Sequence, residues 1–275
     1  MPEVVRIFGH PVGHSISPAI HNALFAALGI DAVYEAVDVP PAELPQAIAE
    51  LRARRLLGAN CTIPHKLAVL DLVDERTEET RLIGAANTLF WRGDALVADN
   101  TDAGGLEQAI RAEWPELRAG RAVVLGSGGA ARAAAVALAR LGCSVTVLAR
   151  REVPAESVAA TAASVGVEAV GMGLQFAAAA VADADLVVNA TPLGLKGEAL
   201  PEPFMRLAPG QAALDLVYGA AATPFVAAAR EHGAWAADGL GMLVGQAALA
   251  FQRWTGREAP FAAMEAAAKA ALGRG

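Results

Sequence analysis

The segment Ala122-Val123-Val124-Leu125-Gly126-Ser127-Gly128-Gly129-Ala130-Ala131 is the clearest indication of the fold class of this chain. Its first four residues are apolar and predict a buried strand, and the alanine-rich run that continues to Leu141 predicts a helix. The pattern G-x-G-x-x-[GA] falls where the strand becomes the helix. There the first two glycines permit a tight turn and a close approach to a pyrophosphate, and Ala131 lets the helix pack on the strand. Although an ordinary glycine turn is the alternative, this context favours a dinucleotide-binding unit.

The stretches after this segment continue to alternate between strands and helices. Apolar strands are predicted at 144–148, 167–170, 186–189 and 212–217. Strands separated by helices are typical of a parallel sheet built from βαβ units. We therefore expect a Rossmann-type sheet in the middle of the chain.

The N-terminal part of the chain predicts a second α/β region. Its first helix, 17–28, is expected to begin with Ser17 as the N-cap and Pro18 at the first helical position. The other elements expected here are strands 4–8, 32–39 and 59–63, helices 42–57 and 65–73, and a hairpin over 87–98. Two C-terminal helices are predicted at 241–254 and 260–272.

Composition limits the classes of protein to which the chain can belong. Its 275 residues, 55% of them hydrophobic and 5% aromatic, suffice for one large or two ordinary α/β domains with an aliphatic core. A formal net charge of −7 argues against a nucleic-acid partner. No apolar run approaches the roughly 18 residues of a membrane span, and the N-terminus has no signal-peptide pattern. We expect a soluble, cytoplasmic protein with no membrane partner.

Cysteine and histidine usage predicts no metal site. Cys61 and Cys143 lie far apart, and the 5 histidines show no metal-ligand spacing. Both cysteines are expected to be small buried residues in a reducing compartment.

Two polar runs, Asn60-Cys61-Thr62-Ile63-Pro64-His65-Lys66 and Asp99-Asn100-Thr101-Asp102, each follow a predicted strand. Polar groups gathered at strand ends are typical of ligand sites in α/β proteins. A lysine beside a carboxylate could act as a proton donor and its orienting partner. The plainer alternatives are a solvated surface lysine at Lys66 and a helix N-cap at Asp102.

The residues after the second Rossmann strand indicate which dinucleotide is bound. Enzymes that use NAD usually carry an acidic residue about 20 residues beyond the glycines, where it bonds the ribose hydroxyls. Here the strand ends at Ala149-Arg150-Arg151, and the first carboxylate is Glu152. Two guanidiniums suit a 2′-phosphate. Unless both arginines are merely solvated loop residues, the sequence favours NADP over NAD.

The motifs taken together resemble one known family. Their order along nearly the whole chain is similar to that of the shikimate dehydrogenases, NADP-dependent reductases of the aromatic amino-acid pathway. The blocks that carry the resemblance, besides the two polar runs and the glycine segment, are His14-Ser15-Ile16-Ser17-Pro18, Gly84-Ala85-Ala86-Asn87-Thr88, Asn189-Ala190-Thr191-Pro192 and Asp238-Gly239-Leu240-Gly241-Met242-Leu243-Val244-Gly245-Gln246.

The resemblance implies an α/β fold of two domains. Residues 1–103 plus 240–275 would form an α/β substrate-binding and catalytic domain completed by C-terminal helices, and residues 104–239 a Rossmann-type NADP-binding domain. The implied reaction is the reversible NADPH-dependent reduction of the small molecule 3-dehydroshikimate to shikimate, in a cleft between the domains. We expect a monomer or a homodimer.

The resemblance also implies roles for individual residues. Lys66 would be the catalytic proton donor, held by Asp102. Substrate binding would fall to Ser15 and Ser17 at the carboxylate, Tyr218 as a supporting phenol, and Thr62, Asn87, Asp102 and Gln246 at the ring oxygens. NADP binding would fall to Gly126, Ser127, Gly128, Gly129, Ala130, Arg150, Arg151, Thr191, Leu216 and Gly239.

Several of these residues also have purely structural interpretations. Asn87 could hold a loop, Gln246 could lie on the protein surface, and Tyr218 could belong to the core. The chain also departs from the family pattern at Pro154, where a further basic residue is expected, and at Cys61, where valine is common and an oxidisable thiol would lie near the site.

Competing functions remain open at this stage. One is a quinate/shikimate dehydrogenase that uses NAD or both cofactors, and another is an aminoshikimate-type enzyme. Outside the enzymes, the chain could be a non-catalytic NADP-binding module with a regulatory role. Retention of Lys66, Asn87 and Asp102 together favours an enzyme, because a sensor needs no proton donor.

Overall fold

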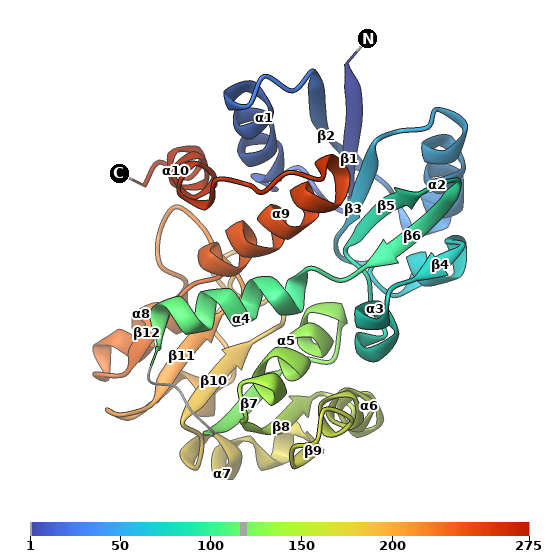
Figure 1. The fold of residues 1–275 in the computed structure, drawn as a ribbon. Coiled ribbons are helices and arrows are strands. Elements are labelled where there is room, and N and C mark those ends of the chain that lie inside the picture. Colours follow the sequence, from blue (N-terminus) through green and yellow to red (C-terminus); the bar gives the residue numbers. More distant parts are fainter. Residues whose placement is uncertain (1, 116–119, 275) are drawn as a thin grey trace. The chain divides into compact units, whose positions relative to one another are not determined.

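The computed structural model describes residues 2–115 and 120–274, which fall into two compact units (Figure 1). The N-terminal unit comprises Met1–Gly105 with Val244–Gly275, and the central unit comprises Leu106–Leu243. The chain passes between them inside helix α4 (Asp102–Glu113) and inside helix α9 (Leu240–Thr255). Each unit has its own sheet, so the predicted α/β fold class is confirmed.

The sheet of the N-terminal unit has six strands in the order β2-β1-β3-β5-β6-β4. Strand β1 is parallel to β2 and β3, whereas β5 is antiparallel to β3 and β6. The carboxyl ends of β1, β3 and β6 and the amino end of β5 therefore meet at one edge. The strands are β1 (Glu3–Gly9), β2 (Ala32–Asp38), β3 (Gly58–Cys61), β4 (Glu75–Arg76), β5 (Thr88–Arg92) and β6 (Ala95–Asp99).

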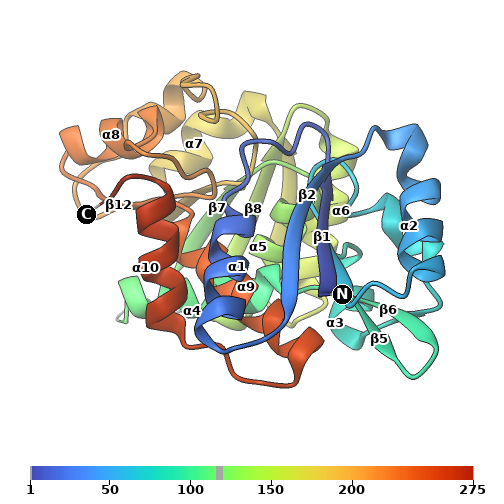
Figure 2. The same ribbon diagram turned by 90° about the horizontal axis from the view of Figure 1, so that it is seen from above.

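Helices of the N-terminal unit come from both ends of the chain. Helix α1 (Ser17–Ala27) packs against α10 (Phe261–Ala271), and the two lie side by side in both views (Figures 1 and 2). Two further helices are α2 (Leu44–Ala53) and α3 (Glu78–Ile83). The short elements α3 and β4 carry little periodicity and are absent from the sequence prediction.

The predicted helix over 65–73 is wrong. Residues around Lys66 form a turn, and only a short 3-10 helix, Ala68–Leu72, follows. The reason is tertiary: the Lys66 carbonyl accepts a hydrogen bond from the Ala86 amide at 2.8 Å, and the His65 ring contacts the Val39 carbonyl at 2.7 Å. The Leu70 amide, which would donate to the Lys66 carbonyl in an α-helix, donates instead to the Leu67 carbonyl at 3.1 Å, so the helical spacing in the sequence is overridden.

The predicted N-cap at Ser17 is also wrong. Helix α1 begins at Ser17, and Ile16 occupies the N-cap position. The Ser17 amide donates to the Ser15 hydroxyl at 3.3 Å, so Ser15 satisfies the first amide of the helix. Pro18 is therefore the second residue of the helix and not the first as predicted, but it still lies in the first turn, where the N–H that it lacks would be unsatisfied.

The central unit is a doubly wound parallel sheet in the order β12-β11-β10-β7-β8-β9. Its first strand, β7 (Arg121–Leu125), lies in the middle, with the next two strands on one side and the last three on the other. This is the Rossmann strand order. The other strands are β8 (Ser144–Ala149), β9 (Ala169–Gly173), β10 (Leu186–Asn189), β11 (Ala212–Asp215) and β12 (Trp235–Ala237).

Helices α5 (Gly129–Arg140) and α6 (Glu152–Ala163) pack against β8 in the central unit. Helix α8 (Pro224–Glu231) packs against β11 and β12, and α7 (Ala177–Ala182) is a short helix before β10. Strand β12 was not predicted, because three residues give too short a pattern. The predicted strand at 186–189 coincides with β10.

An aromatic cluster in the N-terminal unit encloses a histidine. His21 has no exposed surface, stacks on Tyr34 with ring centroids 4.5 Å apart, and lies 5.2 Å from the Trp254 ring. Neither ring nitrogen has a hydrogen-bond partner among the described residues. Burial therefore lowers the pKa of His21 from 6.5 to about 3, and the ring stays neutral in the folded protein.

This burial predicts a loss of stability in mild acid. The unfolded chain binds a proton at His21 near pH 6.5 and the folded protein only near pH 3, so stability is present above the first value and lost as pH falls toward the second. Between pH 7 and pH 5 this group should remove about 2 kcal/mol of unfolding free energy. Urea unfolding at both pH values should show a smaller loss in His21→Phe. The exposed-site control His232→Phe should behave like the parent, and equal losses in all three proteins would contradict the assignment.

Candidate active site

A lysine and an aspartate form an ion pair at the sheet edge of the N-terminal unit. The Lys66 ammonium donates to Asp102 Oδ2, and the two side chains are 13% and 4% exposed. Lys66 is therefore not a solvated surface lysine. Because both groups are largely removed from water, each depends on the other and on neighbouring dipoles for compensation.

Asp102 does not serve as the cap of helix α4. The Asn100 side chain accepts hydrogen bonds from the amides of Asp102 at 3.0 Å and Ala103 at 3.3 Å. Its amide group also donates to the Ala85 carbonyl at 2.8 Å, which fixes its orientation. Since Asn100 does the capping, the Asp102 carboxylate is left to face Lys66.

Asn87 is the centre of the polar cluster. Its Nδ2 lies 2.9 Å from Thr101 Oγ1, 3.0 Å from Asp102 Oδ1 and 3.1 Å from Gln246 Oε1, while its Oδ1 accepts from the Thr101 amide at 2.8 Å. Asn87 is 3% exposed and Gln246 9%. Gln246 is therefore not a surface residue, and its helix α9 is brought to the same edge.

No individual roles were predicted for the residues behind Asn87. Asn60 Nδ2 donates to the Asn87 carbonyl at 2.9 Å and to Thr88 Oγ1 at 3.1 Å, and the Tyr34 hydroxyl donates to Asn60 Oδ1 at 2.6 Å. These buried side chains hold the backbone that carries Asn87. An asparagine inside the apolar strand β3 is the sequence signal that could have identified this support.

Ser15, Ser17 and Thr62 lie on two loops of the same edge. The loop after β1 carries Ser15 and leads into helix α1, which begins at Ser17, and the loop after β3 carries Thr62. The His10 amide joins the two loops by donating to the Ile63 carbonyl at 3.0 Å. Ser17 is buried, whereas Ser15 and Thr62 are partly exposed.

Direct hydrogen bonds join four of the predicted residues, Lys66, Asn87, Asp102 and Gln246.

The concern that Cys61 adds an oxidisable thiol is not supported. Cys61 is 1% exposed, and burial raises the pKa of its thiol to about 12, although the charge of Lys66 acts in the opposite direction. The thiolate is the reactive form of cysteine, so the neutral buried thiol is inert at neutral pH.

The glycine turn of the central unit is shaped to receive an anion. Gly126 has φ +126°, and a Cβ there would lie 2.9 Å from the Ala190 carbonyl oxygen, so only glycine fits. At Gly128 an added Cβ would meet nothing within 4 Å, which leaves open space in front of helix α5. The first amides of α5 point into such a space, and Ala131 has no exposed surface. These residues fit a dinucleotide pyrophosphate.

The remaining predicted cofactor residues also lie at the carboxyl ends of the central strands. Arg150 and Arg151 are exposed, and they connect β8 to helix α6. Thr191 follows β10, and its hydroxyl donates to Asn189 Oδ1 at 2.7 Å. Gly239 is buried, and a Cβ there would lie 2.3 Å from the Leu216 carbonyl oxygen.

A buried carboxylate organises the same end of the central sheet. Asp215 accepts hydrogen bonds from Asn189 Nδ2 at 2.8 Å, the Thr223 hydroxyl at 2.6 Å and the Val217 amide at 3.0 Å. Burial raises its pKa above the ordinary value. Asp215 thereby connects the loop that carries Thr191 to the segment before Tyr218. Tyr218 is only partly buried and is not a core residue.

Residues 2–115 and 120–274 lack two kinds of feature. They contain no group of three or more His, Cys, Asp or Glu side chains that could hold a metal ion. They also contain no helix long and apolar enough to cross a membrane.

The fold and the glycine turn define a two-unit α/β protein of the dinucleotide-binding class. Family models for the shikimate dehydrogenase substrate binding domain and the shikimate 5′-dehydrogenase C-terminal domain match residues 7–89 and 239–269.

Relatives match the chain over nearly its whole length. The shikimate dehydrogenase (NADP(+)) of Symbiobacterium thermophilum is 44% identical over 98% of this chain and 94% of its own. That of Moorella thermoacetica is 42% identical with the same coverage, 98% and 94%. The crystal structure of the Thermus thermophilus enzyme with NADP(H) and shikimate has a TM-score of 0.86 and 39% identity, over 98% of this chain and 100% of that one. The chain therefore belongs to the shikimate dehydrogenase family, and the predicted resemblance is confirmed.

Proposed function

We propose that this protein is an NADP-dependent shikimate dehydrogenase that reversibly reduces 3-dehydroshikimate to shikimate. The observation that carries the proposal is the buried pair of Lys66 and Asp102, joined by Asn87, in a chain 44% identical to a relative of that name. A non-catalytic NADP-binding module would not need such a pair. An NAD-dependent quinate dehydrogenase is not favoured, because the relatives are named for NADP(+).

The two units divide the task in this proposal. The N-terminal unit binds the substrate, and the central unit binds NADP. The two buried cysteines, which form no disulfide, fit a reducing compartment such as the cytoplasm. We propose a cytoplasmic enzyme that acts as a monomer or a homodimer.

Substrate recognition follows from the polar groups of 3-dehydroshikimate. Its carboxylate would be bound by the hydroxyls of Ser15 and Ser17, supported by the phenol of Tyr218, because hydroxyl donors match carboxylate oxygens. Its ring oxygens would be bound by the polar side chains at the sheet edge. We assign this role to Thr62, Asn87, Asp102 and Gln246.

Lys66 is the proposed proton donor to the ketone oxygen. Its ammonium gives up one proton as the C=O bond becomes C–OH, and the neutral amine takes the proton back in the oxidation direction. Asp102 holds the ammonium and accepts from a neighbouring substrate hydroxyl. Bound NADPH supplies the hydride that completes the two-electron reduction. Because Asn87 also bonds Asp102, the carboxylate is oriented before substrate arrives.

The proposed NADP site lies along the carboxyl ends of the central strands. The pyrophosphate would lie against the turn of Gly126, Ser127, Gly128, Gly129 and Ala130. Arg150 and Arg151 would bind the 2′-phosphate, since planar guanidiniums make charge-assisted bonds to phosphate oxygens. The nicotinamide end would be bordered by Thr191, Leu216 and Gly239.

A spectrophotometric assay tests the function directly. Shikimate and quinate are offered in parallel with NADP and with NAD, and reduced cofactor is followed by absorbance. Shikimate with NADP should give the highest kcat/KM. A preference for quinate or for NAD would replace the proposal with the quinate/shikimate alternative, and no turnover of any combination would favour the non-catalytic module.

Replacement of Lys66 tests the proton-transfer step. Lys66→Ala should lower kcat by roughly 10²–10⁴, the size of a lost general acid, with a smaller change in the KM for shikimate. Asp102→Asn should also slow turnover. The double variant should cost less than the sum of the two, because the residues act as one unit. Additive losses, measured by steady-state kinetics, would assign them separate roles.

Replacement of Arg150 tests cofactor selection. Loss of one charge-assisted bond is worth about 1.5–3 kcal/mol, or about tenfold to a hundredfold in affinity. Arg150→Ala should therefore raise the Kd for NADP by that factor and leave the Kd for NAD nearly unchanged, as measured by titration of the protein with each cofactor. Arg257→Ala is the matched control, since it removes an exposed arginine from the N-terminal unit. An equal rise in the Kd values of both cofactors would mean that Arg150 contacts the adenine or stabilises the fold, and does not select the 2′-phosphate.

A further inference from the structure

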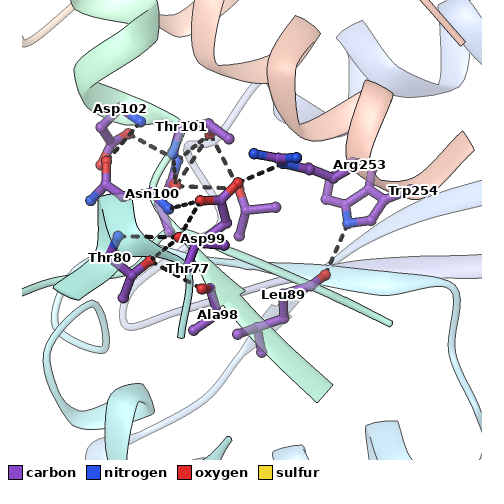
Figure 3. Close-up of polar contacts among 12 residues, drawn as sticks. Thr77, Thr80, Leu89, Ala98, Asp99, Asn100, Thr101, Asp102, Arg253 and Trp254 are labelled. Carbon is purple, nitrogen blue, oxygen red and sulfur yellow. Dashed lines mark hydrogen bonds and ion pairs between the residues drawn. The ribbon is translucent and has the colours of Figure 1, made fainter. Parts of the chain in front are cut away.

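The C-terminal end of helix α9 is tied to two strands by consecutive side chains, Arg253 and Trp254 (Figure 3). Arg253 Nε donates to Asp99 Oδ2 at 2.6 Å, and Trp254 Nε1 donates to the Leu89 carbonyl at 3.0 Å. Leu89 belongs to β5, and Asp99 is the last residue of β6. One end of the helix is thus fixed to both strands of the hairpin at the site.

The partner of Arg253 is a deeply buried carboxylate. The Asp99 side chain is 2% exposed, and its other oxygen, Oδ1, accepts from the Thr77 hydroxyl at 2.7 Å and from the Asn100 amide at 2.9 Å. The Arg253 guanidinium also lies 5.5 Å from the centre of the Phe90 ring. Although half of the Arg253 side chain is exposed, the buried Asp99 carboxylate favours keeping its cation, because breaking the pair leaves an uncompensated charge. The contact therefore resists rotation or sliding of α9.

Helix geometry connects this anchor to the candidate active site. Gln246 precedes Arg253 by seven residues, which is about two helical turns, so both side chains project from the same face of α9. Gln246 Oε1 accepts from Asn87 Nδ2 at 3.1 Å. Near Gln246, helix α9 is in close contact with helix α4. A Cβ added to Gly105 of α4 would lie only 2.4 Å from the Gln246 amide nitrogen. The rotation of helix α9 about its axis, which decides where the Gln246 side chain lies, is thus fixed by two contacts: the Arg253–Asp99 ion pair and the packing against Gly105.

We propose that Arg253 is a positioning residue whose bond to Asp99 holds Gln246 at the substrate site. The inference rests on the proposed function, in which Gln246 bonds a substrate ring oxygen. Asp99 acts in two directions, because it also accepts from the amide of Asn100, the residue that caps α4 ahead of Asp102. One carboxylate thereby orients a residue of the C-terminal helix and the start of the helix that carries Asp102.

The experiment is a double-variant cycle in the full chain, with steady-state kinetics on shikimate and NADP. Arg253→Ala should raise the KM for shikimate roughly three- to tenfold, the size of one lost hydrogen bond, and leave kcat and the KM for NADP within about twofold. Gln246→Ala should raise the KM for shikimate similarly. In the Gln246→Ala background, Arg253→Ala should add less than about twofold, because its effect passes through Gln246. Arg257→Ala, which removes an exposed arginine just beyond α9, is the matched control.

Further variants separate positioning from folding. Arg253→Ala leaves Asp99 without its cation, so Arg253→Ala with Asp99→Asn removes both charges and should show the same shift in the KM for shikimate. Arg253→Lys keeps the charge but loses the planar fork, and should give an intermediate KM. Multiplicative effects of Arg253→Ala and Gln246→Ala would overturn the inference, as would equal changes in the KM values of both substrates. An unchanged KM in Gln246→Ala would overturn it together with the role of Gln246, whereas failure of the proposed function would appear as no turnover of shikimate in the unmodified protein.

Discussion

An ammonium and a carboxylate that are both withdrawn from water constrain everything around them. Lys66 and Asp102 can remain charged in such a place only if their remaining polar atoms also find partners, because desolvation of an ion costs several kcal/mol. The Asn87 amide supplies one partner for Asp102, and Asn87 is itself held by Thr101 and Gln246. The polar cluster is therefore a single unit, in which removal of any member leaves another unsatisfied.

The topology of the N-terminal sheet explains why these residues meet although they are far apart in sequence. Strands β1, β3 and β6 end at the same edge, and the antiparallel strand β5 begins there. Residues that directly follow β1, β3 and β6, and residues that directly precede β5, are therefore neighbours in space. Gln246 comes from helix α9 and needs a separate anchor, since no strand end places it.

The sequence predicted the architecture well where a local pattern and the tertiary structure agree. The strand at 186–189, the hairpin before Asp99 and the glycine turn all have strong local signals. The helix expected around Lys66 failed because the Ala86 amide takes the Lys66 carbonyl, a contact that no local pattern reveals. The N-cap predicted at Ser17 failed for a smaller reason, since Ser15, two residues earlier in the loop, accepts the hydrogen bond from the Ser17 amide.

The site shows the same division between local and distant information. Lys66 and Asp102 were already indicated by the polar runs at strand ends, whereas Asn87 and Gln246 were predicted only because the order of motifs resembles a family. The structure adds the hydrogen bonds that unite all four residues. The role of a supporting residue such as Asn60 depends on partners that are distant in sequence. Asn60 accepts a hydrogen bond from Tyr34 and donates one to the Asn87 carbonyl. A buried polar residue in an apolar strand marks such a position, but its partners become evident only when the strands are paired.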